Sequence, residues 1–220
     1  MSYWTILGPG RGETVIKKST FIGYAAYVKD EQEAKEFVAS IKAEHPKARH
    51  HASAWIVGIE TPIPRYDDDK EPSGTAGPPI LAILEGEDLK NVCVVVVRYF
   101  GGILLGTGGL VRAYSEGARL ALEDAGIVEM REFTEGRLEV DYTSLGSIQY
   151  LAAQMGVELY DEVYTDRVNL GLRTLEENWQ NVVTKIEELT SARCTFSEVT
   201  TRLYPSREGK RMKGDIHESF

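Results

Sequence analysis

The second part of the chain has the more regular pattern of hydrophobic and polar positions. Residues 136–144 alternate apolar and charged side chains, which is typical of a half-buried strand. Apolar side chains at helical spacing predict a helix over 145–156, and residues 157–175 predict two strands joined by a turn. A second amphipathic helix over 176–189 and a Thr-rich strand over 193–204 follow. This βαββαβ order predicts a ferredoxin-like domain, in which both helices cover one face of a four-stranded antiparallel sheet.

The first part is longer and less regular. Residues 13–28 predict two strands with a turn near Thr20, and Asp30 is a suitable N-cap for a helix over 31–44. The continuous β-branched run at 91–100 predicts a strand that is buried on both faces. The other predicted elements are a strand at 52–59, a Pro-rich loop at 60–79, a short helix at 80–84, a helix at 110–126 and a strand at 127–133. The chain therefore belongs to the α+β class, with a domain boundary near 132–135.

Composition narrows the class of protein. The chain has 220 residues, of which 42% are hydrophobic and 27% charged, as in an ordinary globular protein. Its longest apolar run is far shorter than the roughly 20 residues of a membrane helix, and its first residues do not resemble a secretory signal. We therefore expect a cytoplasmic protein with no membrane partner. Cys93 and Cys194 lack CxxC spacing and clustered His, which argues against a zinc site and against disulfides.

The net charge of −9 is unevenly distributed. Residues 1–133 carry 15 Lys and Arg against 19 Asp and Glu, residues 134–200 carry 5 against 12, and residues 201–220 carry 5 against 3. No segment is strongly basic, whereas binding to duplex DNA requires many neutralised phosphates. This distribution excludes a duplex DNA binder. It leaves room for a local basic site that binds a folded RNA or a protein.

The stretch RYFGGILLGTGGLVRAYS, residues 98–115, contains five glycines between a predicted buried strand and a helix that starts near Gly108. The first amides of a helix have no partner within it and attract anions, and glycine lets the main chain approach a phosphate closely. We therefore predict a ligand or RNA contact surface. Its residues are Arg98, Gly101, Gly102, Gly108, Gly109 and Arg112. In the alternative, the glycines only permit tight turns and close helix packing. The stretch matches neither a Walker loop nor the GxGxxG pattern.

The stretch DDDKEPSGTAGPP, residues 67–79, is a second candidate, and His50 and His51 precede a nearby strand. In one interpretation the carboxylates brace a Pro-rich loop, Ser73 or Thr75 is the N-cap of the next helix, and Pro78 and Pro79 lie in its first turn. In the other, Ser73, His50 and Asp68 act as nucleophile, base and orienting group, or the acidic residues bind a metal with His50. The spacing requires neither enzyme arrangement, and Ser73 lies in no GxSxG motif.

These two stretches, together with ARHHASAW at 48–55, closely resemble the YigZ/IMPACT family over the whole length of the chain. The resemblance implies an N-terminal domain with the fold of ribosomal protein S5 domain 2, which domain IV of elongation factor G also has, and a C-terminal domain similar to domain V of that factor. Eukaryotic relatives regulate translation during amino-acid starvation stress by competing for an activator of an initiation-factor kinase. For bacterial members it implies a translation-linked or RNA-binding role. Asp67 and Lys70 depart from the family, which usually has Ser and Gly there.

From these observations we predict three segments: an IMPACT-type N-terminal domain at 1–133, a ferredoxin-like domain at 134–204 and a flexible tail at 205–220. The tail carries basic residues, and the acidic C-terminal domain is a second docking surface. Since each motif joins a strand of one sheet to a helix, we expect a groove where they meet. Arg98 and Arg112 form its basic floor, and Asp68, Asp69 and Glu71 form its acidic rim. Gly74 and Thr75 join the contact surface, while His50, Asp68, Asp69 and Glu71 position the loop.

The predicted function is that of a translation-associated regulatory protein, which binds structured RNA, the ribosome or a protein of translation control. This function requires no catalytic step, no cofactor and no metal. The alternative is a nucleotide-dependent phosphotransferase or hydrolase that uses the Gly-rich loop, by analogy with kinases that share the S5-like fold. The sequence predicts no particular oligomeric state.

Overall fold

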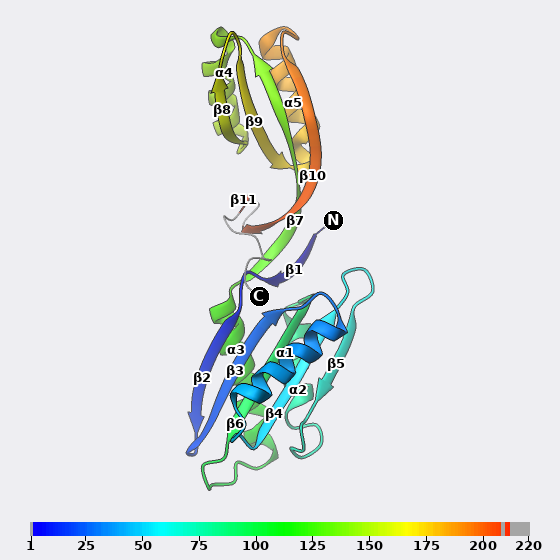
Figure 1. Ribbon diagram of the computed structural model, residues 1–220, viewed down its shortest axis with the longest axis vertical. Helices are drawn as coiled ribbons and strands as arrows, with labels where there is room; N and C mark the ends of the chain where they lie inside the picture. Colours follow the sequence, from blue (N-terminus) through cyan, green and yellow to red (C-terminus); the bar gives the residue numbers. More distant parts are fainter. Residues whose placement is uncertain (1, 208–209, 212–220) are drawn as a thin grey trace. The chain divides into compact units, whose positions relative to one another are not determined.

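The computed structural model describes residues 2–207 and 210–211, and its chain forms two compact units (Figure 1). The first unit comprises Tyr3–Glu129, and the second starts at Met130. The two-domain α+β architecture predicted from the sequence is confirmed. Among the described residues, no helix is both long enough and apolar enough to cross a membrane.

The first unit is built on a five-stranded sheet in which every pair of neighbours is antiparallel. β1 (Ser2–Ile6) precedes this sheet, and Ile6 enters the core of the unit. Across the sheet the strands lie in the order β2 (Gly10–Ile16), β3 (Ser19–Tyr27), β6 (Val92–Tyr99), β4 (His50–Val57) and β5 (Ile63–Asp67).

Helices cover both faces of this sheet (Figure 1). α2 (Gly77–Gly86) and α3 (Thr107–Ala125) pack on one face, and α1 (Glu31–Glu44) packs on the other. Successive side chains of the central strand β6 point to opposite faces. Val92, Val94 and Val96 enter the core under α2 and α3, whereas Cys93, Val95 and Val97 face α1. This confirms the predicted strand that is buried on both faces, and it places Arg98 next on the α2 and α3 side.

Several boundaries differ from the sequence prediction. The turn between β2 and β3 lies at Lys17 and Lys18, both in the left-handed region, rather than near Thr20. β5 occupies part of the Pro-rich segment, and Pro64 is tolerated there because β5 is an edge strand. α2 begins at Gly77, earlier than the predicted 80, because prolines are well suited to a first helical turn.

The second unit has the predicted βαββαβ order. Its strands lie in the order β10-β7-β9-β8, and α4 and α5 bury apolar residues in one core with the sheet. The predicted strands at 127–133 and 136–144 merge into one strand, β7, and the predicted boundary at 132–135 lies inside it. β7 ends before residue 144, because the helix predicted from 145 already begins at 142. The elements are β7 (Ile127–Val140), α4 (Tyr142–Met155), β8 (Glu158–Tyr164), β9 (Val168–Leu175), α5 (Glu176–Thr190) and β10 (Thr195–Arg207).

The segment predicted as a tail begins inside this unit. Residues 205–207 belong to β10, and β11 (Lys210–Arg211) pairs antiparallel with the end of β10. Ser206 is buried, so the chain is anchored at this point. Residues 208–209 and 212–220, which include the basic Lys213, lie outside the described residues.

Candidate functional site

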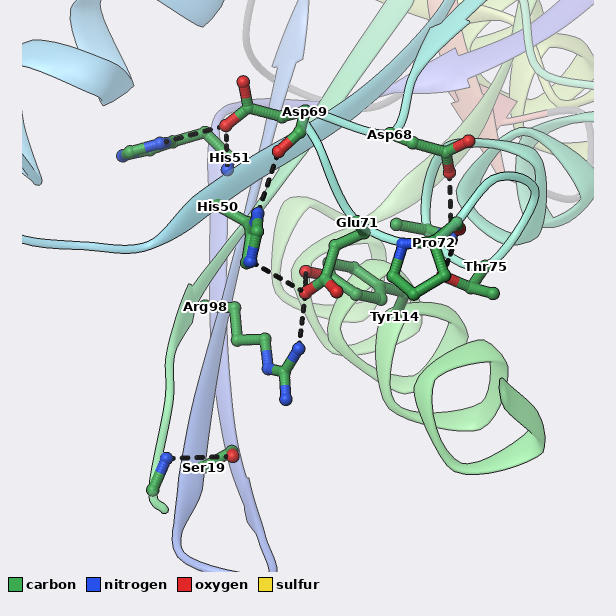
Figure 2. Close-up of polar contacts among 12 residues, drawn as sticks. Ser19, His50, His51, Asp68, Asp69, Glu71, Pro72, Thr75, Arg98 and Tyr114 are labelled. Carbon is green, nitrogen blue, oxygen red and sulfur yellow. Dashed lines mark hydrogen bonds and ion pairs between the residues drawn. The ribbon is translucent and has the colours of Figure 1, made fainter. Parts of the chain in front are cut away.

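A buried carboxylate joins the two sequence motifs (Figure 2). Glu71 Oε1 accepts hydrogen bonds from Arg98 Nη1 at 2.6 Å and from the Tyr114 hydroxyl at 2.7 Å. Glu71 is 8% exposed, Arg98 is 5% exposed, and Tyr114 is fully buried. The loop before α2, the end of β6 and the first half of α3 are therefore held together by one charge network.

Arg98 lies where its position in β6 dictates. It follows Val94 and Val96 on the face that α2 and α3 cover, so its side chain enters the interior. Its guanidinium carbon lies 5.5 Å from the ring centroid of Phe21 and 5.5 Å from that of Phe100. The prediction that Arg98 forms an exposed basic floor is therefore wrong. Arg98 and Glu71, expected as floor and rim of a groove, neutralise each other inside the unit.

Tyr114 completes the network as a neutral donor. Burial raises the pKa of its hydroxyl, and the charge of Glu71 raises it further. The hydroxyl therefore stays protonated and donates a hydrogen bond to the Glu71 carboxylate. The sequence analysis did not single out Tyr114, although its helical spacing from Leu110 and Ala118 places it on the buried face of α3.

Asp68 closes the start of α2 from outside the helix. Its Oδ2 accepts from the Gly74 amide at 2.8 Å, and its Oδ1 accepts from the amides of Ala76 at 3.0 Å and Gly77 at 2.8 Å. The amides of Ala76 and Gly77 lie at the helix start, where they have no internal partner, and the negative charge also suits the positive end of the helix dipole. The loop-positioning role predicted for Asp68 has a physical basis in these three bonds.

The capping residue itself differs from the prediction. The N-cap position is Ala76, whose side chain has no acceptor, so neither Ser73 nor Thr75 is the cap. The Thr75 hydroxyl instead donates to the Pro72 carbonyl at 2.6 Å and is buried. The proximity of Asp68 to Ala76 depends on the turn at residues 68–75, which short-range spacing did not reveal. Pro78 and Pro79 do lie in the first turn, as predicted.

Asp69 ties the same loop to β4 and α1. Its Oδ2 accepts from the His51 amide at 2.7 Å, and its Oδ1 lies 3.3 Å from Lys42 Nζ. Burial raises the pKa of the Asp69 carboxyl, but the His51 amide and the charge of Lys42 outweigh that effect, and the pKa lies below its ordinary value. The carboxylate is therefore ionised and holds the loop against the strand.

His50 contacts this loop rather than a nucleophile. Its Nδ1 lies 2.8 Å from the Asp69 carbonyl oxygen, and its Nε2 lies 3.7 Å from Glu71 Oε1. Ser73 is exposed, and Asp68 is committed to three amides, so the Ser, His and Asp arrangement considered from the sequence is not formed. Among the described residues, no group of three or more His, Cys, Asp or Glu side chains is placed to hold a metal ion.

The turn that positions these carboxylates has a left-handed backbone. Asp69 has φ of 43° and Lys70 has φ of 69°. Glycine adopts this region without the steric cost that a Cβ imposes. The glycine expected at position 70 from the family resemblance therefore has a conformational reason. Lys70 keeps the same turn, and both Asp68 and Asp69 reach their partners.

The Gly-rich loop between β6 and α3 is largely exposed, which we call open. The acidic loop is held by hydrogen bonds of its own carboxylates, which we call closed. Gly102 and Gly106 have φ of 83° and 75°, and Leu104, between them, is 82% exposed. Gly101 is different, because a Cβ there would lie 2.0 Å from the carbonyl carbon of Lys18. Its amide also donates to Ser19 Oγ at 3.1 Å. Gly101 thus packs the loop onto the β2–β3 turn and does not offer its amide to a ligand.

Among the described residues, no carboxylate caps the start of α3. Its N-cap is Gly106, whose carbonyl accepts from the amides of Gly109 and Leu110 at 3.1 and 3.0 Å. Among the described residues, the amides of Thr107 and Gly108 have no hydrogen-bond partner. Gly108 is exposed, as predicted for a contact residue, whereas the Gly109 amide is occupied.

Arg112 is the exposed arginine of the predicted pair. It has no ion pair or hydrogen bond to the rest of the described chain. Its Nη1 lies 4.0 Å from the position that a Cβ at Gly108 would take. The guanidinium therefore lies beside the first turn of α3, next to the unpartnered amides.

Three further cations at this end were missed by the sequence analysis. Lys17 and Lys18 are exposed in the turn on which Gly101 packs, and Arg49 is exposed with its guanidinium carbon 5.4 Å from the Phe100 ring centroid. The signal that was missed is the pairing of strands. The register places Thr20 opposite Tyr99 and His50 opposite Arg98, so the residues just outside these pairs gather at one end of the sheet.

These features define a two-domain α+β protein in which a closed acidic loop and an open Gly-rich loop share one end of the first unit. Residues 17–122 match the family described as "Impact N-terminal domain", and residues 138–193 match "Domain of unknown function (DUF1949)". The chain belongs to the IMPACT family, as its motifs predicted.

Relatives support this assignment over most of the chain. The IMPACT family member YvyE of Bacillus subtilis is 39% identical over 197 residues, which are 90% of this chain and 91% of the relative. The IMPACT family member YigZ of Escherichia coli is 43% identical over 169 residues, covering 74% of this chain and 82% of the relative. A solved structure described as that of a hypothetical protein is 36% identical, covers 89% of this chain and 96% of its own, and has a TM-score of 0.57.

Proposed function

We propose that this chain is a translation-associated regulatory protein that binds structured RNA through the open end of its first unit. We call this surface the Gly-rich end, and it comprises Lys17, Lys18, Arg49, Gly102, Thr107, Gly108 and Arg112. The observation that carries the proposal is the combination of two unpartnered amides at the start of α3, with Arg112 beside them, and three more exposed cations at the same end of the sheet. Gly74, Thr75, Arg98, Gly101 and Gly109 are left out of this surface, because Thr75 and Arg98 are buried and the amides of the three glycines are occupied.

Phosphate is the chemistry that this arrangement suits. Helix N-terminal amides bind phosphate oxygens, and a guanidinium adds two parallel donors. Lysines in the β2–β3 turn supply point charges at a second position on the backbone of a nucleic acid. The exposed part of Phe100, beside Arg49, offers an aromatic surface on which an unpaired base stacks. A folded RNA presents phosphates at several positions along its backbone together with unpaired bases, which favours RNA over a free nucleotide.

The link to translation comes from family membership. The resemblance implies folds that domains IV and V of elongation factor G also have, and eukaryotic relatives act in translation control. A protein of the translation machinery is therefore a second class of partner. The second unit is acidic, which does not favour binding of RNA there. We place RNA binding on the first unit alone.

Salt-dependent binding to purified ribosomal RNA tests the proposal. Four phosphate contacts predict that affinity falls about a hundredfold between about 50 and 200 mM salt. Arg112→Ala should weaken binding to every RNA tested and lower the salt slope by about one. The matched control is Arg119→Ala, an exposed arginine further along α3 and away from its start.

Three outcomes count against the proposal. Equal RNA binding by the Arg112→Ala and Arg119→Ala proteins removes the Gly-rich end from the interaction. Thermal stabilisation by ATP or GTP with magnesium, lost in Arg112→Ala, supports a nucleotide-dependent enzyme instead. Salt-tolerant binding to one identified protein, without RNA, supports a protein regulator.

A further inference from the structure

The second unit contains a helix with no charged residue. α4 (Tyr142–Met155) has no Asp, Glu, Lys or Arg, although charged residues make up 27% of the chain. The neighbouring α5 has four acidic residues and one lysine exposed along its length, as a solvated helix usually does. The absence of charge on α4 is therefore not a property of the whole unit.

One face of α4 is nevertheless exposed. The helix buries Ile148 and Ala152 in the core with α5 and the sheet. On its other side an exposed stripe follows the helical spacing, and we call it the α4 face. It consists of Tyr142, Gly146, Gln149, Tyr150 and Ala153. Tyr150 is 70% exposed, and a Cβ at Gly146 would meet no atom within 4 Å. Tyrosine is enriched, and charge is depleted, at the centres of protein interfaces, whereas solvated surfaces keep their charges.

The aromatic surface continues onto β8. The rings of Tyr142 and Tyr164 lie 6.2 Å apart at an interplanar angle of 32°. The Tyr142 hydroxyl donates to the Thr165 carbonyl at 2.6 Å, so the β8–β9 turn lies beside the start of α4. The α4 face and the end of β8 therefore form one exposed surface with two ordered tyrosines.

Acidic residues border this surface within residues 138–166, and Arg137 and Arg167 flank that segment. Residues 138–166 contain six Asp and Glu and no Lys or Arg. Four of these carboxylates, Glu139, Asp141, Glu158 and Asp161, lie within 4 Å of an arginine from another strand or turn.

The other two acidic residues keep their charge available. Glu162 contacts Gln149 of the α4 face and accepts from the Tyr164 hydroxyl, and Asp166 lies in the turn beside Tyr142. Neither carboxylate has a cationic partner among the described residues. A binding partner therefore meets an uncharged centre with uncompensated carboxylates along one side.

We propose that the α4 face docks a protein segment with an uncharged centre and lysines or arginines along its flank. Complementary charge across an interface selects partners and sets their orientation. A second copy of this chain would bring two acidic borders together, and RNA would meet the same carboxylates, so both occupants are disfavoured. The docking surface is independent of the Gly-rich end, because it lies entirely in the second unit.

Two synthetic helical peptides test the charge argument on the full chain. They share a central stripe of Ala, Leu and Tyr, are each about 20 residues and about 30 Å long, and carry either Lys or Glu along both flanks. We expect saturable binding of the Lys peptide by fluorescence anisotropy and no binding of the Glu peptide. Tyr150→Ala should weaken the Lys peptide about tenfold, because exposed tyrosines at interface centres are frequent anchors.

The matched control separates this surface from general attraction to an acidic protein. Val199→Ala removes a side chain of β10 in the same unit that is 52% exposed and leaves the charge unchanged. It should bind the Lys peptide like the unaltered protein, whereas Glu162→Gln should reduce both affinity and salt dependence. Neither Tyr150 nor Val199 is buried, so all variants are expected to fold.

Several results overturn the proposal. These are equal peptide affinity for Tyr150→Ala and Val199→Ala, binding of the Glu peptide, and failure of the Lys peptide to bind. A concentration-dependent dimer in sedimentation that Tyr150→Ala dissociates assigns the face to a second copy instead. Loss of ribosomal RNA binding in Tyr150→Ala, with Arg112→Ala unaffected, would overturn both this proposal and the RNA proposal for the Gly-rich end.

Discussion

The two helix starts at one end of the first unit differ in how their amides are satisfied. The loop before α2 folds back so that Asp68 binds three amides around the first turn of the helix. The loop before α3 supplies only a glycine N-cap, and the amides of Thr107 and Gly108 stay unpartnered among the described residues. Both loops contain glycine, and among the described residues the two helix starts differ in the Asp68 carboxylate, which occupies amides only at the start of α2.

The largest expected effect concerns the carboxylate that links the two loops. Glu71→Gln keeps the shape of the side chain but removes the charge that compensates buried Arg98. We expect the free energy of unfolding to fall by about 3 kcal/mol, because an unpaired charge in the interior is costly. Urea unfolding of the full chain measures it. A loss below about 1 kcal/mol would show that water reaches Arg98 and that the closed loop is less closed than described.

The next prediction concerns the Asp68 carboxylate, which binds the amides at the start of α2. Asp68→Ala leaves the amides of Gly74, Ala76 and Gly77 without their acceptor. Loss of a helix cap typically costs about 1 to 2 kcal/mol, and we expect a decrease of that size in urea unfolding. Asp67→Ala is a useful control, because Asp67 is exposed and accepts from a single amide, that of Asp69. Equal losses in the two variants would contradict the special role of Asp68.

A stabilising change is expected at the turn that positions Asp68. Lys70→Gly relieves the left-handed conformation at φ of 69°. Because a Cβ in this region costs about 1 kcal/mol, we expect a rise in unfolding free energy of up to that amount. Lys70→Ala keeps the Cβ and removes only the amine, so it should leave stability nearly unchanged. If both variants behave alike, side-chain charge and not backbone strain is the dominant factor.

The smallest expected effect comes from a substitution that places a carboxylate at the start of α3, as Asp68 does at the start of α2. Thr107→Asp places a carboxylate in the first turn of α3, where its interaction with the helix dipole stabilises the folded state by about 0.5 kcal/mol. The same charge occupies the position proposed for an RNA phosphate. We therefore expect slightly higher thermal stability together with weaker ribosomal RNA binding, relative to Thr107→Asn. Unchanged RNA binding would separate the start of α3 from the ligand.

The second unit was predictable from sequence because each of its elements has one clear periodicity. Its βαββαβ order follows from alternation in the strands and from helical spacing at Ile148, Ala152, Val182 and Ile186. The sequence prediction missed the full length of β7, the start of α4 at Tyr142 and the end of β10 at Arg207. Every second residue of β7 from Val128 to Val140 except Glu132 is buried, so the strand continues through the position where a boundary was predicted, although Gly136 lies within it.

The candidate site was predictable only in part. The motifs marked the two loops that precede α2 and α3, and the start of α3 lies within one residue of Gly108. The roles of individual residues depend on contacts between elements distant in sequence, such as Glu71 with Arg98 and Tyr114. The alternation of β6 alone would have placed Arg98 in the interior. The capping of α2 by Asp68 required the path of the turn, which single-residue preferences do not specify.

The contact between Gly101 and Lys18 has a consequence for how this end of the unit tolerates change. The loop is attached to the β2–β3 turn at Gly101 and to α3 at Gly106. The residues between these two points do not position the strands or the helix. Insertions or deletions among residues 102–105 should therefore leave the distance between the two lysines and the helix start nearly the same. The strands therefore set the spacing of the charges, and the exposed apolar tip at Ile103 and Leu104 does not.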